Sequence, residues 1–254
     1  GLTLRFTSGL TTAAADTTAR YFAFAPAPGG FQVGNPTLNP EKRWSLDLGA
    51  EWKGRWLELR ASTYLNQVQD HIVRRTLERR DVNGDGTPDR VWGFVNTQAQ
   101  LIGGELAATC NPLRWLRVPL SVAYVHGQDT ALDAPLPEIP PLDLRAALRG
   151  ESPDRAPTAL GGWAEVGVRH AAAQERVSDA FGEDPTPAFT VVHVKLGVHL
   201  WQHGLAELGV ENLFDRQYHE HLTREVMLPV DGLGAGDELP APGRRVFLRV
   251  RVTL

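Results

Sequence analysis

The sequence predicts an all-β fold, an antiparallel up-and-down sheet of about ten strands that forms a segment of a transmembrane β-barrel. Three observations predict it. Hydrophobic side chains recur at every second position in about ten segments. The connections between these segments alternate between short turns and long loops. Tryptophans gather beside the short turns, where one edge of a membrane is expected.

Composition narrows the class of protein. The chain of 254 residues is 42% hydrophobic, so it is not a disordered polymer. A net charge of −4 with dispersed Lys and Arg gives no basic surface for nucleic acid. Cys110 is the one cysteine, which excludes an internal disulfide and a cysteine-based zinc site. No run reaches the roughly 18 apolar residues of a spanning helix, so any membrane crossing must use strands.

Period-two alternation places the strands, and hardly any segment has a helical pattern. In chain order we expect strands over residues 1–7, 43–53, 55–68, 91–109, 113–126, 141–150, 158–170, 189–201, 204–215 and 243–254. Within the strand at 91–109, the alternation changes parity at Gly103-Gly104, which predicts a β-bulge.

The connections carry further information. Short ones are expected at 53–54, 111–112, 152–157 and 202–204, and long ones, rich in Gly, Pro and Asp, at 8–42, 69–90, 127–140, 171–188 and 216–242. Five long structureless loops argue against a compact soluble domain. Outer-membrane barrels have this layout, with short turns at the periplasmic end and long loops at the extracellular end.

The strand at 189–201 shows two different faces. One face carries Val192, Val194, Leu196, Val198 and Leu200, and the other carries His193, Lys195 and His199. In the last strand Arg249 and Arg251 share the polar face, and an Arg at the lipid midplane costs about 2–4 kcal/mol. We therefore expect the apolar face to contact lipid and the polar face to line the lumen.

Four tryptophans lie beside short turns: Trp52, Trp56, Trp115 and Trp201. They are expected to form an aromatic girdle at the periplasmic interface. A soluble antiparallel sandwich remains an alternative, because it also alternates, with its apolar face turned inward. Loop asymmetry and tryptophan placement favour the membrane barrel.

Several motifs then resemble one family. The segments GNPTLNPE at 34–41, VENLFDRQY at 210–218 and PGRR at 242–245 occur in this order, with GGEL at 103–106 and SVAYVHG at 121–127 between them. Together they resemble the C-terminal half of the barrel of TonB-dependent outer-membrane receptors. The residues that match the motifs are Asn35, Pro36, Leu38, Pro40, Glu41, Asn212, Leu213, Phe214, Asp215, Tyr218, Gly243 and Arg244.

The resemblance implies a fold, a location and a function. It implies that residues 1–254 are the C-terminal portion of a 22-strand barrel in the bacterial outer membrane, with a plug domain, a TonB box and the first strands upstream of Gly1. It implies a receptor, not an enzyme, that binds a metal chelate or cobalamin and imports it with energy from the TonB complex. An iron–siderophore complex is the first expectation, with copper or cobalamin as others. A complete ten-stranded barrel acting as a pore or surface hydrolase remains the alternative.

The expected ligand site lies mainly in the loops, whereas the expected scaffold residues lie in the motifs. The loops at 69–90, 127–140, 171–188 and 216–242 are expected to form part of the ligand vestibule, with Tyr218, His219, His221 and Arg224 as its candidate residues. The scaffold roles follow from chemistry. Asn212 and Asp215 can tie a strand end to its loop, Gly243 permits a strained backbone, and Arg244 or Arg245 can pair with Glu211.

The segment DVNGDGTPD at 81–89 resembles part of a calcium loop. Asp81, Asn83, Asp85 and Asp89 occupy positions 1, 3, 5 and 9, and Gly86 stands at the sharp turn. Position 12 is Trp92 in place of a bidentate Glu, so the segment is no EF-hand. A weak calcium site and an ordinary polar turn both remain open, and no other cofactor and no catalytic motif is expected.

Overall fold

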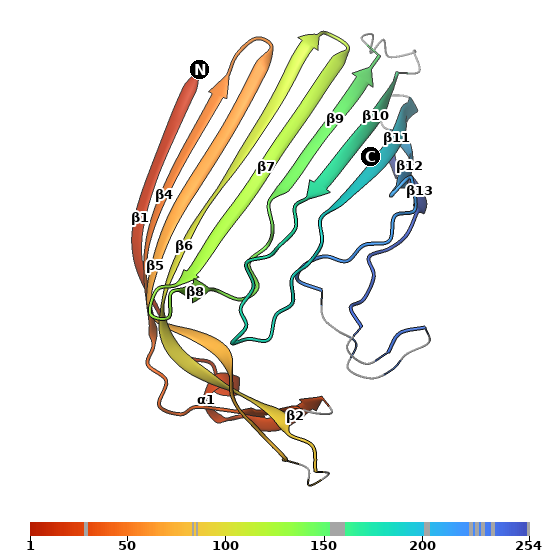
Figure 1. Ribbon diagram of the computed structural model, residues 1–254. Coiled ribbons are helices and arrows are strands. Elements are labelled where there is room, and N and C mark those ends of the chain that lie inside the picture. The colour runs from red at the N-terminus through yellow and green to blue at the C-terminus, as the bar shows by residue number, and fades with distance from the viewer. Residues whose placement is uncertain are drawn as a thin grey trace.

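A computed structural model describes residues 1–27, 30–82, 84, 86–152, 161–200, 204–223, 226, 229, 232–234 and 237–252. Its strands form one curved sheet (Figure 1). The path across the sheet, each strand antiparallel to the next, is β1 (Leu2–Ala13), β4 (Glu41–Lys53), β5 (Leu57–Arg80), β6 (Asp89–Leu113), β7 (Leu116–Asp129), β9 (Asp143–Glu151), β10 (Gly162–Ala171), β11 (Phe189–Leu200), β12 (Gly204–Glu211) and β13 (Arg245–Val252). The ten strands on this path confirm the sequence prediction.

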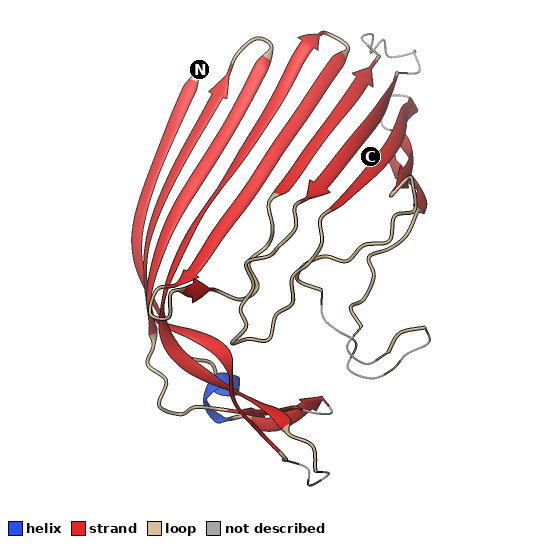
Figure 2. Cartoon of the chain, viewed as in Figure 1, coloured by secondary structure: helices blue, strands red, loops and turns tan. Residues whose placement is uncertain are grey.

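Short and long connections separate to opposite ends of the sheet. Gly54–Trp56 and Arg114–Trp115 connect strands at one end, the short-turn end, whereas the long segments lie at the other, the loop end (Figure 2). The only helix of the described residues is α1 (Thr17–Tyr21), which Asp16 caps by accepting from Ala19 N at 2.7 Å. In the described part of the chain, no helix has the length and apolar character needed to span a membrane.

The two faces of the sheet differ in chemistry, as the alternation predicts. We call the outer face the one that carries exposed hydrophobic side chains, among them Leu48, Leu120, Leu196, Leu208, Leu248 and Val250. The inner face carries charged pairs: Arg245 pairs with Glu211, and Arg249 Nη1 lies 3.6 Å from Glu207 Oε1. These residues lie directly opposite each other on β12 and β13. A shift of the last strand by one residue would move its arginines to the outer face, so the ion pairs fix the register of β13.

The tryptophans at the short-turn end are exposed. Trp52, Trp56 and Trp115 are 37%, 57% and 48% exposed, and each adjoins a short turn. Trp201 lies outside the described residues. The placement is the one that an interfacial girdle requires.

Aromatic rings lie against glycines on the inner face. In four directly paired positions the ring of one strand covers the glycine of the next: Tyr64 on Gly103, His193 on Gly167, Trp163 on Gly197 and Phe247 on Gly209. A Cβ at each glycine would meet the ring at 2.2–2.5 Å. The glycines therefore let bulky rings lie flat along the wall and leave the interior open.

The prediction of a bulge at Gly103-Gly104 is wrong. Pairing runs without interruption through both glycines to β5 and to β7. The parity change arises because Leu101 faces inward, where it packs against a cluster of buried side chains formed by Val68, Ala99, Leu136 and Ile139. These last two side chains come from the segment after β7, so the apparent change reflects a loop folded against the inner face.

Several expected loops contain strand. The expected loop at 69–90 is mostly hairpin, because β5 continues to Arg80 and β6 begins at Asp89. Register shifts between Val68 and His71 and between Thr76 and Glu78 break the alternation, which hid this hairpin from a period-two search. The turn expected at 111–112 lies instead at 114–115, after a further register shift in β6.

The expected loop at 8–42 is also structured. β1 extends to Ala13, and α1 precedes β2 (Ala23–Ala27) and β3 (Gly30–Val33), which pairs in parallel with β6. The expected loop at 127–140 contains the short β8 (Ala134–Pro135), which pairs with β7. These pieces are too short to show a period in the sequence.

The motif at 34–41 anchors this region to the hairpin of β5 and β6. Asn35 Nδ2 donates to Phe94 O at 3.0 Å, and Leu38 is buried. Glu41 Oε1 accepts from Ile72 N at 2.7 Å and lies 2.7 Å from His71 Nδ1, beside the first register shift of β5. Glu41 thus satisfies a backbone amide near the point where the ladder is interrupted.

Candidate functional site

The inner face holds a cavity of about 610 Å³. Its walls come from β6, β7 and β9 to β13, together with the segment between β12 and β13. The ionisable residues that line it are Arg145, Glu165, Arg169, His193, Lys195, Glu211 and Arg245. Since a cavity that spans so many neighbouring strands needs a concave wall, the inner face is the concave face of the sheet.

Arg169 connects the wall of the cavity to a loop. Its Nε donates to Asp143 Oδ2 at 2.6 Å, and its Nη2 donates to Glu220 Oε2 at 3.0 Å. The guanidinium also lies 5.2 Å from the centre of the Phe189 ring. Because one arginine binds carboxylates from β9 and from the segment after β12, it holds that segment against the sheet.

Tyr218 lines the cavity and belongs to the segment between β12 and β13. Its ring stacks on Phe189 with a centroid separation of 4.2 Å, and its carbonyl accepts from Ala241 N at 2.7 Å. Burial raises the pKa of the Tyr218 hydroxyl above its ordinary value, and the Glu220 carboxylate adds to the rise. At neutral pH the ring therefore presents an uncharged hydroxyl beside charged neighbours.

The two candidate histidines bind protein groups. His219 Nε2 lies 2.6 Å from Glu238 Oε2. His221 is buried, with its Nδ1 2.8 Å from Thr186 Oγ1 and its Nε2 3.2 Å from Glu183 Oε1. The structure thus brings Tyr218, His219 and His221 to one loop end, whereas Arg224 lies outside the described residues.

Glu183 joins three long segments. Oε1 accepts from Glu138 N at 2.8 Å, Oε2 accepts from Ser178 N at 2.9 Å, and His221 approaches from the segment after β12. The carboxylate is 9% exposed, so these contacts form away from bulk water. We call these residues the Glu183 junction: Glu138, Ser178, Glu183 and His221.

The motifs at 210–218 and 242–245 interlock. Asn212, which has a positive φ of 48°, donates from Nδ2 to Arg216 O at 2.8 Å and accepts from Arg216 N at 2.9 Å. Asp215 Oδ1 accepts from Arg244 N at 2.7 Å, and a Cβ at Gly243 would lie 2.7 Å from that oxygen. The expected backbone strain at Gly243 is wrong, because its φ is not positive; the close approach of the Asp215 carboxylate is what favours a glycine here. Leu213 N donates to Val192 O at 2.8 Å, and Phe214 is 75% exposed.

Part of the candidate calcium loop is described. Asp81 accepts from Gly84 N at 2.5 Å and from Gly86 N at 2.9 Å, and both glycines have positive φ. Asp89 is buried and accepts from Val82 N at 3.1 Å. Asn83 and Asp85 lie outside the described residues. Within the part of the chain that is described, no group of three or more His, Cys, Asp or Glu is arranged to hold a metal ion.

Sequence reasoning missed four residues of this site: Arg169, Glu183, Phe189 and Glu220. Alternation alone could have placed Arg169 and Phe189 on the inner face, since each stands at an inward position of its strand. Glu183 and Glu220 belong to irregular segments without a period, so no local pattern marks them.

The sequence model described as "TonB dependent receptor-like, beta-barrel" matches residues 1–213. The chain belongs to the TonB-dependent receptors. This family assignment confirms the resemblance carried by the motifs, and its members are outer-membrane barrels that act as receptors and transporters. No curated protein matches the chain.

Solved structures of TonB-dependent receptors share the fold. The copper transporter OprC is 27% identical, with a TM-score of 0.81 over 99% of this chain and 37% of OprC. A mutant of the ferric enterobactin receptor PfeA from Pseudomonas aeruginosa is 18% identical, with a TM-score of 0.64 over 99% of this chain and 38% of that one. The siderophore receptor PirA from Acinetobacter baumannii is 14% identical, with a TM-score of 0.62 over 99% of this chain and 39% of that one. The chain thus spans less than half the length of these structures.

Proposed function

We propose that this chain is the C-terminal barrel portion of an outer-membrane receptor that imports a scarce metal complex with energy transmitted by TonB. The observation that carries the proposal is the family match over residues 1–213. The contacts at the loop end support it, because Arg169, Tyr218 and the Glu183 junction hold long loops over an inner-face cavity.

An iron–siderophore complex is the first candidate cargo. The resemblance favours it. The cationic side chains of the lining outnumber its carboxylates, which suits an anionic chelate: Arg145, Arg169, Lys195 and Arg245 stand against Glu165 and Glu211. Copper is the second candidate, because the 27% identity with OprC extends over nearly the whole chain. Cobalamin has no residue of this chain in its favour.

Uptake in a bacterium that carries the intact receptor tests the proposal. The receptor gene is deleted, and cells are given ⁵⁵Fe-loaded siderophores, copper or cobalamin, with TonB present or absent. The proposal expects one cargo to require both the receptor and TonB. Entry of a cargo through the receptor without TonB would indicate a pore and contradict the transport mechanism.

The segment after β12 provides a sharper test of the vestibule. Residues 222–239 are replaced by a short Gly-Ser linker, which keeps Tyr218, its bond from Ala241 and the Asp215–Arg244 contact. Uptake should weaken while heat-modifiable migration of the barrel stays normal. A matched replacement of 153–160, which follow β9 and precede β10 in the sequence, should leave uptake unchanged. Full uptake with the shortened loop would remove this loop from the ligand site.

A further inference from the structure

Arg176 lies on the outer face of the sheet near the loop end. Its Nη1 lies 2.9 Å from His126 Nδ1, and its Nη2 donates to Gln128 Oε1 at 2.7 Å. His126 and Gln128 share a face of β7 with Leu120 and Tyr124, which are 46% and 48% exposed. His126 is also paired with Ile102, another exposed hydrophobic residue. The guanidinium therefore sits on the face that carries the apolar belt.

The side-chain partners of Arg176 include no carboxylate. Most arginines of the sheet pair with carboxylates, such as Arg75 with Asp129 and Arg149 with Glu151. Among the described residues, Arg176 forms no such pair and bonds only to an imidazole and an amide. The nearest carboxylate in this hydrogen-bond network is that of Asp133. It accepts from Gln128 Nε2 at 2.9 Å, whereas Arg176 donates to the Oε1 of the same amide.

Hydrogen bonds of its own backbone and of Gln174 hold Arg176 in place. Arg176 N donates to Gln174 Oε1 at 3.1 Å, and Gln174 Nε2 donates to Ile139 O at 2.8 Å. Gln174 is buried and bridges to Thr186 through backbone bonds of 2.9 and 3.0 Å. The guanidinium is thus fixed before any ligand arrives, which lowers the entropic cost of binding an anion.

The height of Arg176 along the barrel wall matches the headgroup region. His126 is two residues beyond Tyr124, or about 7 Å along the strand. An exposed Tyr on the outer face is typical of the membrane–water interface. A guanidinium just beyond it lies where lipid phosphates gather, and a charge at the edge of the hydrocarbon is costly without a counter-ion.

We propose that Arg176, held by His126 and Gln128, binds the phosphate of an outer-leaflet lipid against the outer wall of the barrel. This inference rests on the proposed function, because it requires that the outer face contact a membrane. The guanidinium donates to the phosphate oxygens, while the acyl chains of the lipid cover the apolar belt around Leu120 and Tyr124. The lipid, and not a free phosphate, is the ligand because both its phosphate and its chains find a surface here.

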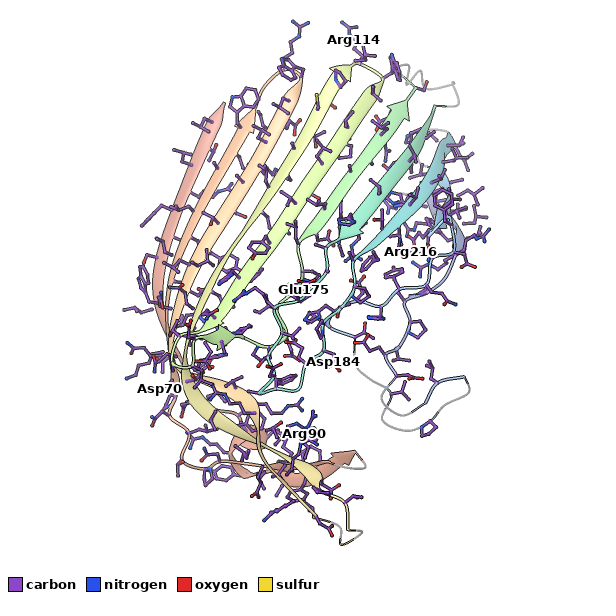
Figure 3. All side chains as sticks on the ribbon, viewed as in Figure 1. Asp70, Arg90, Arg114, Glu175, Asp184 and Arg216 are labelled. Carbon is purple, nitrogen blue, oxygen red and sulfur yellow. The ribbon has the colours of Figure 1, made fainter. Side chains whose placement is uncertain are left out.

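The test measures binding of lipid A to the intact purified receptor in detergent by native mass spectrometry. Arg176→Gln should raise the dissociation constant about tenfold or more, as expected for loss of a charge-assisted hydrogen bond. Arg176→Lys should lose less, because it keeps the charge. The control is Arg114→Gln, an exposed arginine at the opposite, short-turn end (Figure 3). It should bind lipid A like the unchanged receptor.

Three outcomes would overturn the inference: unchanged binding by Arg176→Gln, equal binding of lipid A stripped of its phosphates, or displacement of lipid A by inorganic phosphate at equal concentration. Heat-modifiable migration of every variant reports barrel formation separately. A folded barrel in outer-membrane fractions with unchanged lipid binding defeats only this inference. Absence of the receptor from those fractions defeats the proposed membrane residence as well.

Discussion

At the scale of single residues, the inner wall is shaped by glycines as much as by side chains. The indole ring of Trp163 packs against Gly197, and the guanidinium of Arg149 covers the ring at 3.7 Å from its centre. The same arrangement recurs at Gly103, Gly167 and Gly209. In each case a bulky ring occupies the volume that a Cβ on the neighbouring strand would need.

Gly197→Ala should destabilise the barrel. A Cβ would lie 2.2 Å from the indole of Trp163, so the ring must move and leave Arg149, at a cost of about 1–3 kcal/mol. The urea midpoint of the intact receptor measures the change. Gly150→Ala is the control, because the nearest atom to its Cβ would be 4.0 Å away. Equal midpoints for both variants would show that the ring is not held as described.

Glu41→Ala should also weaken the fold, because it leaves Ile72 N without an acceptor beside the register shift of β5. An unsatisfied buried amide costs about 1–3 kcal/mol. Glu41→Gln keeps an acceptor oxygen and should retain most of the stability. Hydrogen exchange at Ile72 reports the bond directly, and unchanged protection in Glu41→Ala would contradict its role.

At the scale of elements, the strands were predictable and the irregular segments were not. Along β11, β12 and β13, apolar residues alternate with residues that are mostly polar or small. A membrane-facing strand can therefore be recognised from its local sequence. The loop-end part of the hairpin of β5 and β6 contains two register shifts. It contacts β3 and the segment at 34–41, which are distant from it in sequence. Contacts such as Arg169 with Glu220 depend on how these segments fold back, which no local period encodes.

Calcium binding at the hairpin turn of β5 and β6 stays a prediction. Asp81 caps the turn through Gly84 and Gly86, and a carboxylate oxygen that accepts a hydrogen bond can also ligate a metal ion. A weak site with a dissociation constant of about 0.1–1 mM is expected. Calorimetry on the intact receptor measures it, with Asp81→Asn expected to abolish the signal and Asp184→Asn as the control. If the unchanged receptor gives no heat of calcium binding, the segment is an ordinary polar turn and the calcium site is excluded.

At the scale of the whole molecule, the sheet has two ends. β1 pairs only with β4 and β13 only with β12, so the described strands do not close on themselves. Each outermost strand therefore presents backbone groups that need a partner in hydrocarbon. The resemblance predicted further strands and a plug, and the comparisons agree in fold with chains more than twice as long.

Residues 1–254 expressed alone with an export signal should fail to form a stable barrel. Unpaired backbone groups in lipid cost several kcal/mol each, so the groups of two edge strands together cost more than the usual stability of a domain. Semi-native electrophoresis of outer-membrane fractions measures the outcome. A heat-modifiable band near 27.9 kDa would instead identify a complete ten-stranded barrel and withdraw the transport proposal.

The Glu183 junction has a consequence for how such receptors diversify. Surface loops vary more among relatives than the strands that carry them. Here Glu138, Ser178 and His221 meet at one carboxylate, so an exchange of one loop removes a contact that the other two need. We therefore expect that chimeric receptors that exchange 130–142, 172–188 and 212–242 together retain a specificity that single-loop chimeras lose.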